Sequence, residues 1–261
     1  MHKTLKQNTD LNLIISEISE VAEFLWQRGW AERNAGNISV NLSSIIDEKF
    51  DNLDSFEFAK LDKSYTELSG KYFFISGAGK RMRNMAKEPM KNAIIIKLNN
   101  EGSGYWIISK SKNSNLNIQP TSEMATHLAI HQMIAINGSS DIVVMHAHTT
   151  ELIALTQIKE LCDEEILNNL LWGMHPECKL FVPKGIGFVP FTPSATENIA
   201  IATIKALTNH QVALWEKHGI FSISDSVNEA FDTIDILAKA AKIFLLTKAA
   251  GYSPEGIDLK E

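Results

Sequence analysis

Segments with a helical period and segments with a strand period alternate along all 261 residues, and this mixture limits the possible folds more than any other feature. Apolar residues recur at helical spacing over 13–27, whereas 93–98 and 105–108 have strand character and flank the turn-forming segment 99–104. No internal repeat and no Pro-rich or Gly/Ser-rich linker divides the chain. The pattern therefore predicts one α/β domain spanning 1–261, with a largely antiparallel sheet covered by helices.

The positions of several other elements follow from local signals. A helix is expected from Met124 to about Ala135, before the stop signal Asn137-Gly138. Two capping boxes, Ser194 with Glu197 and Ser226 with Glu229, predict the starts of two later helices. The segment 33–40 is expected to run from a turn into a short alternating strand, and further strands are expected at 72–75, 142–146, 212–215 and 220–223. Residues 43–70 are polar and show no sustained period, which predicts a long surface insertion.

Composition excludes several classes of protein. Hydrophobic residues make up 44% and charged residues 21%, which is typical of a globular chain, and the net charge is −6. A negative charge argues against binding to nucleic acid or to an anionic membrane surface. The chain has no apolar run long enough to span a bilayer and no hydrophobic signal segment at its start, so we expect a cytoplasmic protein. Cys162 and Cys178 form no CxxC motif, which excludes a disulfide scaffold and a thiolate zinc site.

The strongest chemical signal is the sequence His146-Ala147-His148, which ends a predicted buried strand. Histidines at i and i+2 on a strand project to the same face, so they can share one metal ion. A catalytic metal site needs about three protein ligands and one open position. His218, at the tip of a predicted hairpin, can provide the third ligand. The alternative is that the first two histidines only end a strand and that His218 is a surface turn residue.

A rival set lies on the helix that follows Pro120. Glu123, His127 and His131 are spaced at i, i+4 and i+8, on one helix face, and such a stripe can also bind a metal. We favour the interpretation that the two histidines are partly buried packing residues. Glu123 is different, because it lies at a helix N-terminus after Thr121 and Ser122, where free N–H groups and hydroxyls bind anions. A carboxylate there, close to a metal, is a candidate general base.

Two other segments have the character of anion-binding loops. Residues 76–80, Ser-Gly-Ala-Gly-Lys, follow a predicted strand and present small residues beside a lysine, although their spacing is not that of a Walker A loop. In the segment 34–39, the amide of Asn37 can donate to a phosphate or an enolate oxygen. Ordinary turns explain each loop alone, but their combination with the histidines and Glu123 favours a binding site.

Taken together, these motifs resemble those of the class II aldolase/adducin family, in the same order along nearly the whole chain. The segments that carry the resemblance are 34–39 (NAGNIS), 76–80 (SGAGK), 120–123 (PTSE), 146–148 (HAH), 171–178 (LWGMHPEC) and 215–219 (WEKHG). The resemblance implies a single-domain α/β three-layer sandwich with a central, largely antiparallel sheet. It also implies a homotetramer with active sites at subunit interfaces.

The resemblance further implies a reaction and a set of residue roles. His146, His148 and His218 match ligands of one Zn²⁺ per subunit, and Glu123 matches the acid/base that exchanges the proton at the nucleophilic carbon. Glu177 matches a second carboxylate, which serves the aldehyde half of the substrate in a neighbouring subunit. The residues that match contacts to the phosphate-bearing half are Asn34, Gly36, Asn37, Ser76, Gly77, Thr121 and Ser122. The implied substrate is a ketose 1-phosphate, cleaved through an enediolate that the metal stabilises as a Lewis acid.

One loop departs from the family pattern, because Ala78 stands where the family has a second small hydroxyl residue. Phosphate contact at this point is then expected from backbone amides. Two other readings are compatible with the same superfamily. One is another sugar-phosphate aldolase or a 4-epimerase, and the segment around Glu177 argues against the epimerase. The other is an adducin-like binding domain without catalysis, which would be expected to lack the histidine set.

Overall fold

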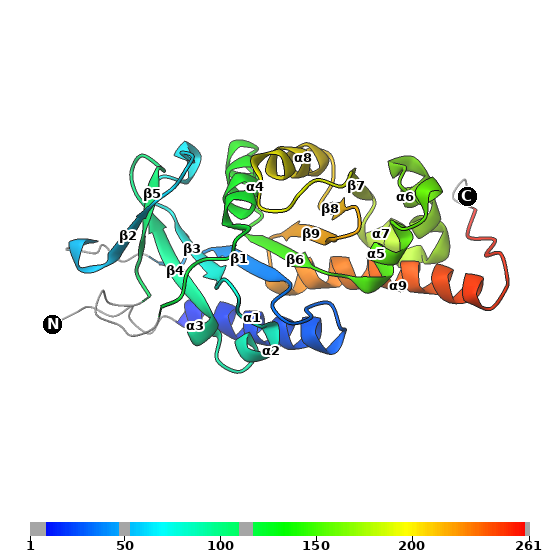
Figure 1. Cartoon of the computed structure of the whole chain (residues 1–261), viewed down its shortest axis with the longest axis horizontal. Helices are drawn as coiled ribbons and strands as arrows, with labels where there is room; N and C mark the ends of the chain where they lie inside the picture. The colour runs from blue at the N-terminus through cyan, green and yellow to red at the C-terminus, as the bar shows by residue number, and fades with distance from the viewer. Residues whose placement is uncertain (1–8, 47–52, 110–116, 259–261) are drawn as a thin grey trace.

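The fold, seen in a computed structural model, is built on one nine-stranded sheet within the described residues 9–46, 53–109 and 117–258 (Figure 1). The strand order is β2-β5-β4-β3-β1-β6-β9-β8-β7. Every neighbouring pair is antiparallel except β7 and β8, which are parallel. The strands are β1 Asn37–Asn41, β2 Glu57–Lys60, β3 Tyr72–Ser76, β4 Ala93–Leu98, β5 Gly104–Ile107, β6 Val143–Ala147, β7 Ile186–Val189, β8 Val212–Trp215 and β9 Gly219–Ser224. The expected largely antiparallel sheet is confirmed.

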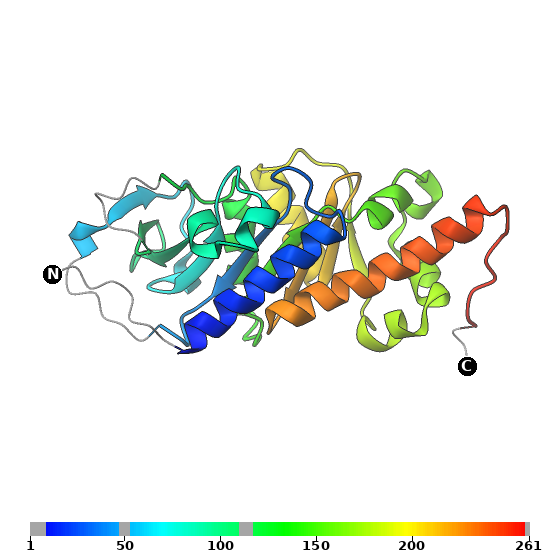
Figure 2. The same ribbon diagram turned by 90° about the horizontal axis from the view of Figure 1, so that it is seen from below.

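Helices cover both faces of the sheet, which confirms the three-layer arrangement. The first helix, α1, and the last, α9, lie side by side along one face, and α4 and α8 cover the other (Figures 1 and 2). The remaining helices are short or lie at one end of the sheet. The α-helices are α1 Thr9–Gln27, α2 Met82–Met85, α3 Pro89–Asn92, α4 Met124–Ile136, α5 Thr150–Leu155, α6 Glu164–Met174, α7 Pro176–Phe181, α8 Glu197–Leu207 and α9 Val227–Ala249.

The central strands are buried on both faces, and their side chains alternate between two cores. In β6, Val143 and Met145 pack toward α1 and α9, whereas Val144 packs toward α4 and α8. The helix α1 turns its periodic apolar residues inward, including Ile18 and Leu25, which are fully buried. This alternation decides on which face of the sheet each polar side chain at a strand end can lie.

The two predicted capping boxes have different outcomes. Ser226 caps α9 as expected, because its side chain accepts a hydrogen bond from the Glu229 amide at 3.2 Å. The prediction of Ser194 as the cap of α8 is wrong. Thr196 occupies that position, and its hydroxyl accepts from the Ile199 amide at 3.4 Å. Threonine is also a favoured cap, and the chain turns into the helix only after Ala195, which has a positive φ of 57°.

The polar segment 43–70 has more structure than its composition suggests. It holds two 3₁₀ turns, η1 (Leu53–Ser55) and η2 (Thr66–Leu68), and the edge strand β2, which pairs with β5. Its residues 47–52 lie outside the described part of the chain. Leu68 is fully buried, so the segment contributes to the core beneath α4 as well as to the surface. A four-residue edge strand with charged ends gives too short a pattern to detect in the sequence.

The strand β7 is at one edge of the sheet. At this edge lie α5, α6 and α7, together with the third 3₁₀ turn, η3 (Lys159–Leu161). These helices pack against the C-terminal half of α9 (Figure 2). Both cysteines are free, with Cys178 buried and Cys162 partly buried. Among the described residues, no helix has the length and apolarity required to cross a membrane.

Candidate active site

Most of the predicted site residues converge on one small cavity of about 170 Å³. It lies where β6 ends, where β1 begins and where α4 begins, beside the loop after β3 and the hairpin between β8 and β9. The residues that line it are Asn34, Ala35, Gly36, Asn37, Gly77, Ala78, Gly79, Thr121, Ser122, Glu123, His146, His148 and His218. Segments that are distant in the sequence therefore meet here.

His146, His148 and His218 form a compact group in this cavity. One ring nitrogen of each lies within 4.8 Å of the others, and among the described residues this is the group of His, Cys, Asp or Glu side chains suited to holding a metal ion. The ring centroid of His146 lies 5.1 Å from that of His148 and 5.2 Å from that of His218. Three imidazoles at these distances can ligate one divalent ion.

The hydrogen bonds of His146 and His148 leave the correct nitrogen free for a metal. Nδ1 of His146 lies 3.0 Å from the Ile220 carbonyl oxygen, which only accepts, so Nδ1 carries the proton. Its Nε2 is buried and has no hydrogen-bond partner within the described chain. Nδ1 of His148 lies 3.0 Å from a carboxylate oxygen of Glu32, which fixes the same tautomer. Outer partners of this kind are typical of metal-ligating histidines, so the donor set fits a metal ion.

Burial keeps two of these histidines in the neutral form that a metal requires. Desolvation lowers the pKa of His146 well below its usual value, and the neighbouring His148 and His218 lower it further. The pKa of His218 is also lowered, first by burial and then by His148, although the nearby Glu123 opposes the change. Both rings therefore present a lone pair at neutral pH.

The β8–β9 hairpin positions His218 through two backbone features. Lys217 adopts a left-handed conformation with φ 60°, and its amide donates to the Thr156 hydroxyl at 2.9 Å. The next residue, Gly219, passes close to the end of β6. A Cβ atom there would lie 2.5 Å from the Ala147 carbonyl oxygen and 2.9 Å from Cε1 of His146. Glycine is required at this position because the two strands approach so closely.

Glu123 lies at the N-terminal end of α4, with its side chain aimed at the histidines. It is only 7% exposed. Its Oε2 accepts a hydrogen bond from Nδ2 of Asn37 at 2.8 Å and lies 3.7 Å from Nε2 of His146. Its Oε1 lies 4.0 Å from Nε2 of His218. A carboxylate held beside the candidate metal ligands can exchange protons with a substrate bound there.

The glycine-rich loop presents fewer free amides than its sequence suggests. Gly77 and Ala78 line the cavity, but their amides already donate to the carbonyl oxygens of Asn92 and Gln119, at 2.9 and 2.8 Å. The amide of Gly79 has no acceptor among the described residues, so this is the group of the loop that can bind an anion.

Two predicted residues lie outside the cavity. The hydroxyl of Ser76 is buried behind its wall, where it accepts from the Ile38 amide at 2.9 Å and donates to the Ile38 carbonyl at 3.0 Å. It therefore joins β3 to β1 and has no free donor for a phosphate. Glu177 lies on α7, half-exposed, with its carboxylate 3.1 Å from Nδ1 of His175. It does not line the cavity of its own chain.

The rival stripe on α4 forms no candidate group of metal ligands among the described residues. His127 and His131 are buried, as favoured, and more completely than a packing role suggests, with exposures of 0% and 2%. Their ring nitrogens bind Asn37 and Ser39 on β1. Two contributors, Ser39 and Glu32, were not predicted from the sequence. Ser39 carried a signal, because it lies two residues after Asn37 and so on the same face of a strand.

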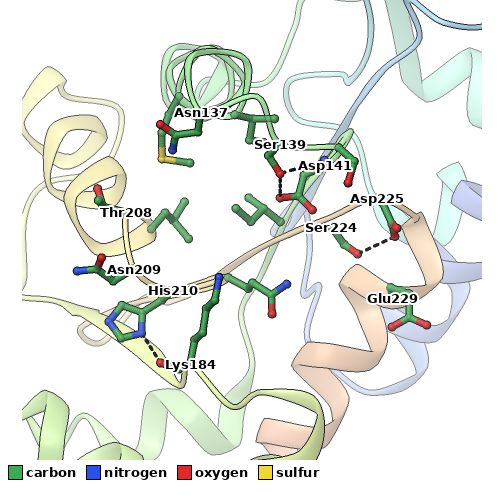
Figure 3. A pocket seen from close by; sticks show the side chains of 16 residues that line it. Asn137, Ser139, Asp141, Lys184, Thr208, Asn209, His210, Ser224, Asp225 and Glu229 are labelled. Atoms are coloured by element: carbon green, nitrogen blue, oxygen red, sulfur yellow. Dashed lines mark hydrogen bonds between the residues drawn. The ribbon is translucent and has the colours of Figure 1, made fainter.

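A larger cavity lies elsewhere in the described part of the chain. It measures about 770 Å³ and opens at the other ends of the same strands, between the C-terminal ends of α4 and α8 (Figure 3). Several of its polar side chains are paired with near neighbours, as Ser139 is with Asp141 and as His210 is with the Lys184 carbonyl. It holds no cluster of metal ligands in the described chain, so size does not identify the site.

Fold and site together define a three-layer α/β protein with a three-histidine group that can hold a metal ion and a carboxylate adjacent to it. Residues 16–245 match the sequence profile of the class II aldolase and adducin N-terminal domain. The chain belongs to this family.

Similar proteins of known name agree with this assignment. The chain is 36% identical to a rhamnulose-1-phosphate aldolase from Bacteroides thetaiotaomicron, over 100% of this chain and 96% of that protein. It is 32% identical to one from Mannheimia succiniciproducens, over 91% of this chain and 87% of the relative. A sugar-phosphate aldolase from Thermotoga maritima has a similar structure, with a TM-score of 0.79, 30% identity, and coverage of 95% of this chain and 100% of that one.

Proposed function

We propose that the protein is a zinc-dependent aldolase that cleaves L-rhamnulose 1-phosphate to dihydroxyacetone phosphate and L-lactaldehyde, in the cytoplasmic breakdown of L-rhamnose. The observation that carries the proposal is the meeting of three histidines and the buried carboxylate of Glu123 at one cavity. The relatives named rhamnulose-1-phosphate aldolase, which are similar over 91% or more of this chain, support the choice of substrate.

His146, His148 and His218 would hold one Zn²⁺ per subunit through their Nε2 atoms. The bound ion supplies Lewis-acid stabilisation of the negative charge that develops on the oxygens of the substrate. The protein contributes the tautomers of His146 and His148, which the Ile220 carbonyl and Glu32 fix in advance.

The cleavage needs two proton transfers, for which two carboxylates are assigned. The bond between C3 and C4 breaks, the C4 hydroxyl loses its proton as the aldehyde forms, and the enediolate gains a proton at C3. Glu123 delivers the proton to C3, because its side chain faces the histidines from the N-terminal end of α4. Glu177 of a neighbouring subunit assists the proton transfer at the C4 hydroxyl, together with bound water. Each such transfer contributes about 10²–10⁴-fold to the rate.

The loops around the cavity are assigned to the phosphate-bearing half of the substrate. The contacts are assigned to residues that line the cavity: Asn34, Gly36 and Asn37 before β1, Gly77 and Gly79 after β3, and Thr121 and Ser122 before α4. Backbone amides near a helix N-terminus favour an anionic group. Gly79 replaces Ser76 in this assignment, because the Ser76 hydroxyl is already engaged by Ile38.

A homotetramer is part of the proposal, since Glu177 does not line the cavity of its own chain and is assigned to the site of a neighbouring subunit. Exposed apolar residues at the same end of the molecule are consistent with a subunit interface there. They include Leu180 and Phe181 on α7, which are 70% and 58% exposed.

A coupled assay for dihydroxyacetone phosphate tests the function. The protein is incubated with a panel of ketose 1-phosphates, and rhamnulose 1-phosphate is expected to give the highest kcat/KM. A chelator should abolish cleavage, and added Zn²⁺ should restore it. Conversion of ribulose 5-phosphate to an epimer, without triose phosphate, would establish the epimerase instead. A lysine adduct trapped by borohydride would point to a Schiff-base aldolase.

The role of Glu123 is tested separately. Glu123→Gln retains an oxygen that can accept from Asn37 but cannot exchange a proton. We expect kcat to fall by about 10²–10⁴-fold while the Zn²⁺ content stays near one per subunit. Turnover close to that of the unmodified enzyme would remove Glu123 from its assigned role.

A further inference from the structure

A chain of buried hydrogen bonds runs from Glu123 into the core between β1 and α4. Asn37 donates to Glu123, and Oδ1 of Asn37 contacts Nε2 of His127. Nδ1 of His127 lies 2.7 Å from the Ser39 hydroxyl, which lies 2.8 Å from Nε2 of His131. The chain forms because residues two apart on the strand face residues four apart on the helix. All five side chains are less than 10% exposed.

The chemistry of the groups fixes the direction of every hydrogen bond. An ionised carboxylate only accepts, so the Asn37 amide must turn Nδ2 to Glu123 and Oδ1 to His127. Nε2 of His127 therefore carries the proton, and its Nδ1 accepts from the Ser39 hydroxyl. Since Ser39 has one proton to give, its oxygen accepts from Nε2 of His131. Nδ1 of His131 is then bare, and it has no partner within the described residues.

Both imidazoles of the chain are neutral at neutral pH, as this assignment requires. Burial lowers the pKa of His127 to about 3 and that of His131 to about 3. Each ring is also held by an aromatic neighbour: Phe221 packs edge-on against His127 with a centroid distance of 5.6 Å, and Phe73 lies 4.9 Å from His131. A neutral, immobile imidazole can donate from only one nitrogen, which makes it a fixed hydrogen-bond partner.

We propose that His127 is a positioning residue for the acid/base Glu123. Its Nε2–H fixes the orientation of the Asn37 amide. That amide in turn holds Oε2 of Glu123 and leaves Oε1 to exchange the proton with the substrate. Ser39 and His131 act behind it by fixing the tautomer of His127. This inference rests on the proposed role of Glu123. Without the lock, the Asn37 side chain can rotate and present its oxygen to the carboxylate, which repels it.

Two substitutions at one position separate this role from a merely structural one. His127→Gln places its amide nitrogen near the position of Nε2 and can still donate to Asn37. His127→Asn places its amide near Nδ1, where it can contact Ser39 but cannot reach Asn37. Both remove the aromatic ring. The assays are aldol cleavage by the zinc-loaded enzyme and exchange of deuterium from D₂O into dihydroxyacetone phosphate, which isolates proton transfer at the nucleophilic carbon.

We expect the rates of His127→Gln to stay within about threefold of those of the unmodified enzyme in both assays. The rates of His127→Asn should fall by about 10- to 100-fold in both, which is the effect of losing a hydrogen bond that controls a charged group. Zinc content and Tm should be similar for the two variants. Equal losses in both variants, or no loss in either, would overturn the proposal. If Glu123→Gln itself retains normal turnover, the proposed function of Glu123 fails instead, and the two failures are thus distinguishable.

The tautomers give a readout that does not depend on activity or on the stability of a variant. In ¹⁵N NMR spectra of the zinc-loaded enzyme labelled at histidine, His127 and His131 should be protonated at Nε2, with the signals assigned through His127→Gln and Ser39→Ala. His146 and His148 should show the opposite tautomer, with the proton on Nδ1. A proton on Nδ1 of His127 in the unmodified enzyme would reverse the chain and exclude the positioning role.

Discussion

The histidines of the candidate metal group and the buried His127 differ in which ring nitrogens they use for contacts within the protein. His146 and His148 donate from Nδ1 to protein oxygens, which frees Nε2 to face the cavity. His127 instead presents its Nε2 to Asn37 and its Nδ1 to Ser39, so both nitrogens are used within the protein. The partner of each ring therefore decides whether it can hold a metal ion or a side chain. This choice is invisible in the sequence, because the partners of each ring come from segments distant along the chain.

Glu32 is expected to strengthen metal binding through His148. The variant Glu32→Gln replaces a charged acceptor at 3.0 Å from Nδ1 by an amide that can also turn its donor to the ring. We expect the affinity for Zn²⁺ to fall by about 10- to 100-fold, the usual effect of losing an outer carboxylate. The measurement is competition against a chromogenic chelator. Glu20→Gln, an exposed change on α1, is the matched control, and an equal effect from both would show that only net charge matters.

At the scale of elements, local patterns were sufficient where one segment determines its own structure. The expected strands 93–98 and 212–215 match β4 and β8, because short apolar runs bounded by turn residues are local signals. The short edge strands β2 and β7 were not predicted. Each has four residues, and their pairing comes from partners elsewhere in the chain. Strand pairing of this kind is a tertiary effect that no window of sequence contains.

The cap of α8 gives a direct test of the structure against the sequence pattern. Thr196→Ala removes the hydroxyl that accepts from the Ile199 amide, so the free energy of unfolding should fall by about 1 kcal/mol. Ser194→Ala, which alters the residue expected from the capping box, should change it by less than about 0.5 kcal/mol. Urea denaturation of both variants measures the difference. If Ser194→Ala is the more damaging change, Thr196 is not the cap.

At the scale of the whole molecule, the site exists because the sheet brings five separate segments to one cavity. The sequence motifs and their family resemblance predicted its members, including Glu123 and the three histidines. They did not show that Ser76 faces the backbone of Ile38 or that His127 and His131 continue the site into the core. Those facts depend on how α4 lies across β1, which is a matter of packing between segments about 90 residues apart.

The buried histidines also make the stability of the molecule depend on pH. An unfolded histidine has a pKa of about 6.5, whereas His131 in the folded state has a pKa of about 3, so protonation below pH 6.5 favours unfolding. Its contribution to stability is complete above pH 6.5 and falls by roughly 1.4 kcal/mol per pH unit as the pH drops toward 3. His131→Phe should therefore flatten this decline.

The measurement is urea denaturation of the metal-free protein at fixed concentration. Between pH 6.5 and 4.5, the free energy of unfolding of His131→Phe should fall by about 2 kcal/mol less than that of the unmodified protein. Ile134→Val, a buried change nearby without a titratable group, should lower stability by about 1 kcal/mol and leave the slope as it was. An unchanged slope in His131→Phe would mean that this ring already binds a proton when folded.

In the proposed mechanism, Glu177 links the chemistry to the assembly, because it lies outside the cavity of its own chain. If a neighbouring subunit supplies this carboxylate, Glu123→Gln and Glu177→Ala inactivate different halves of one shared site. Mixed oligomers made by co-expression then contain sites with both carboxylates intact, about a quarter of the total for random assembly from equal amounts in a closed ring. We expect cleavage activity near this fraction of the unmodified enzyme, well above that of either variant alone. Activity equal to the average of the two separate variants would require Glu177 to act within its own chain, or not at all.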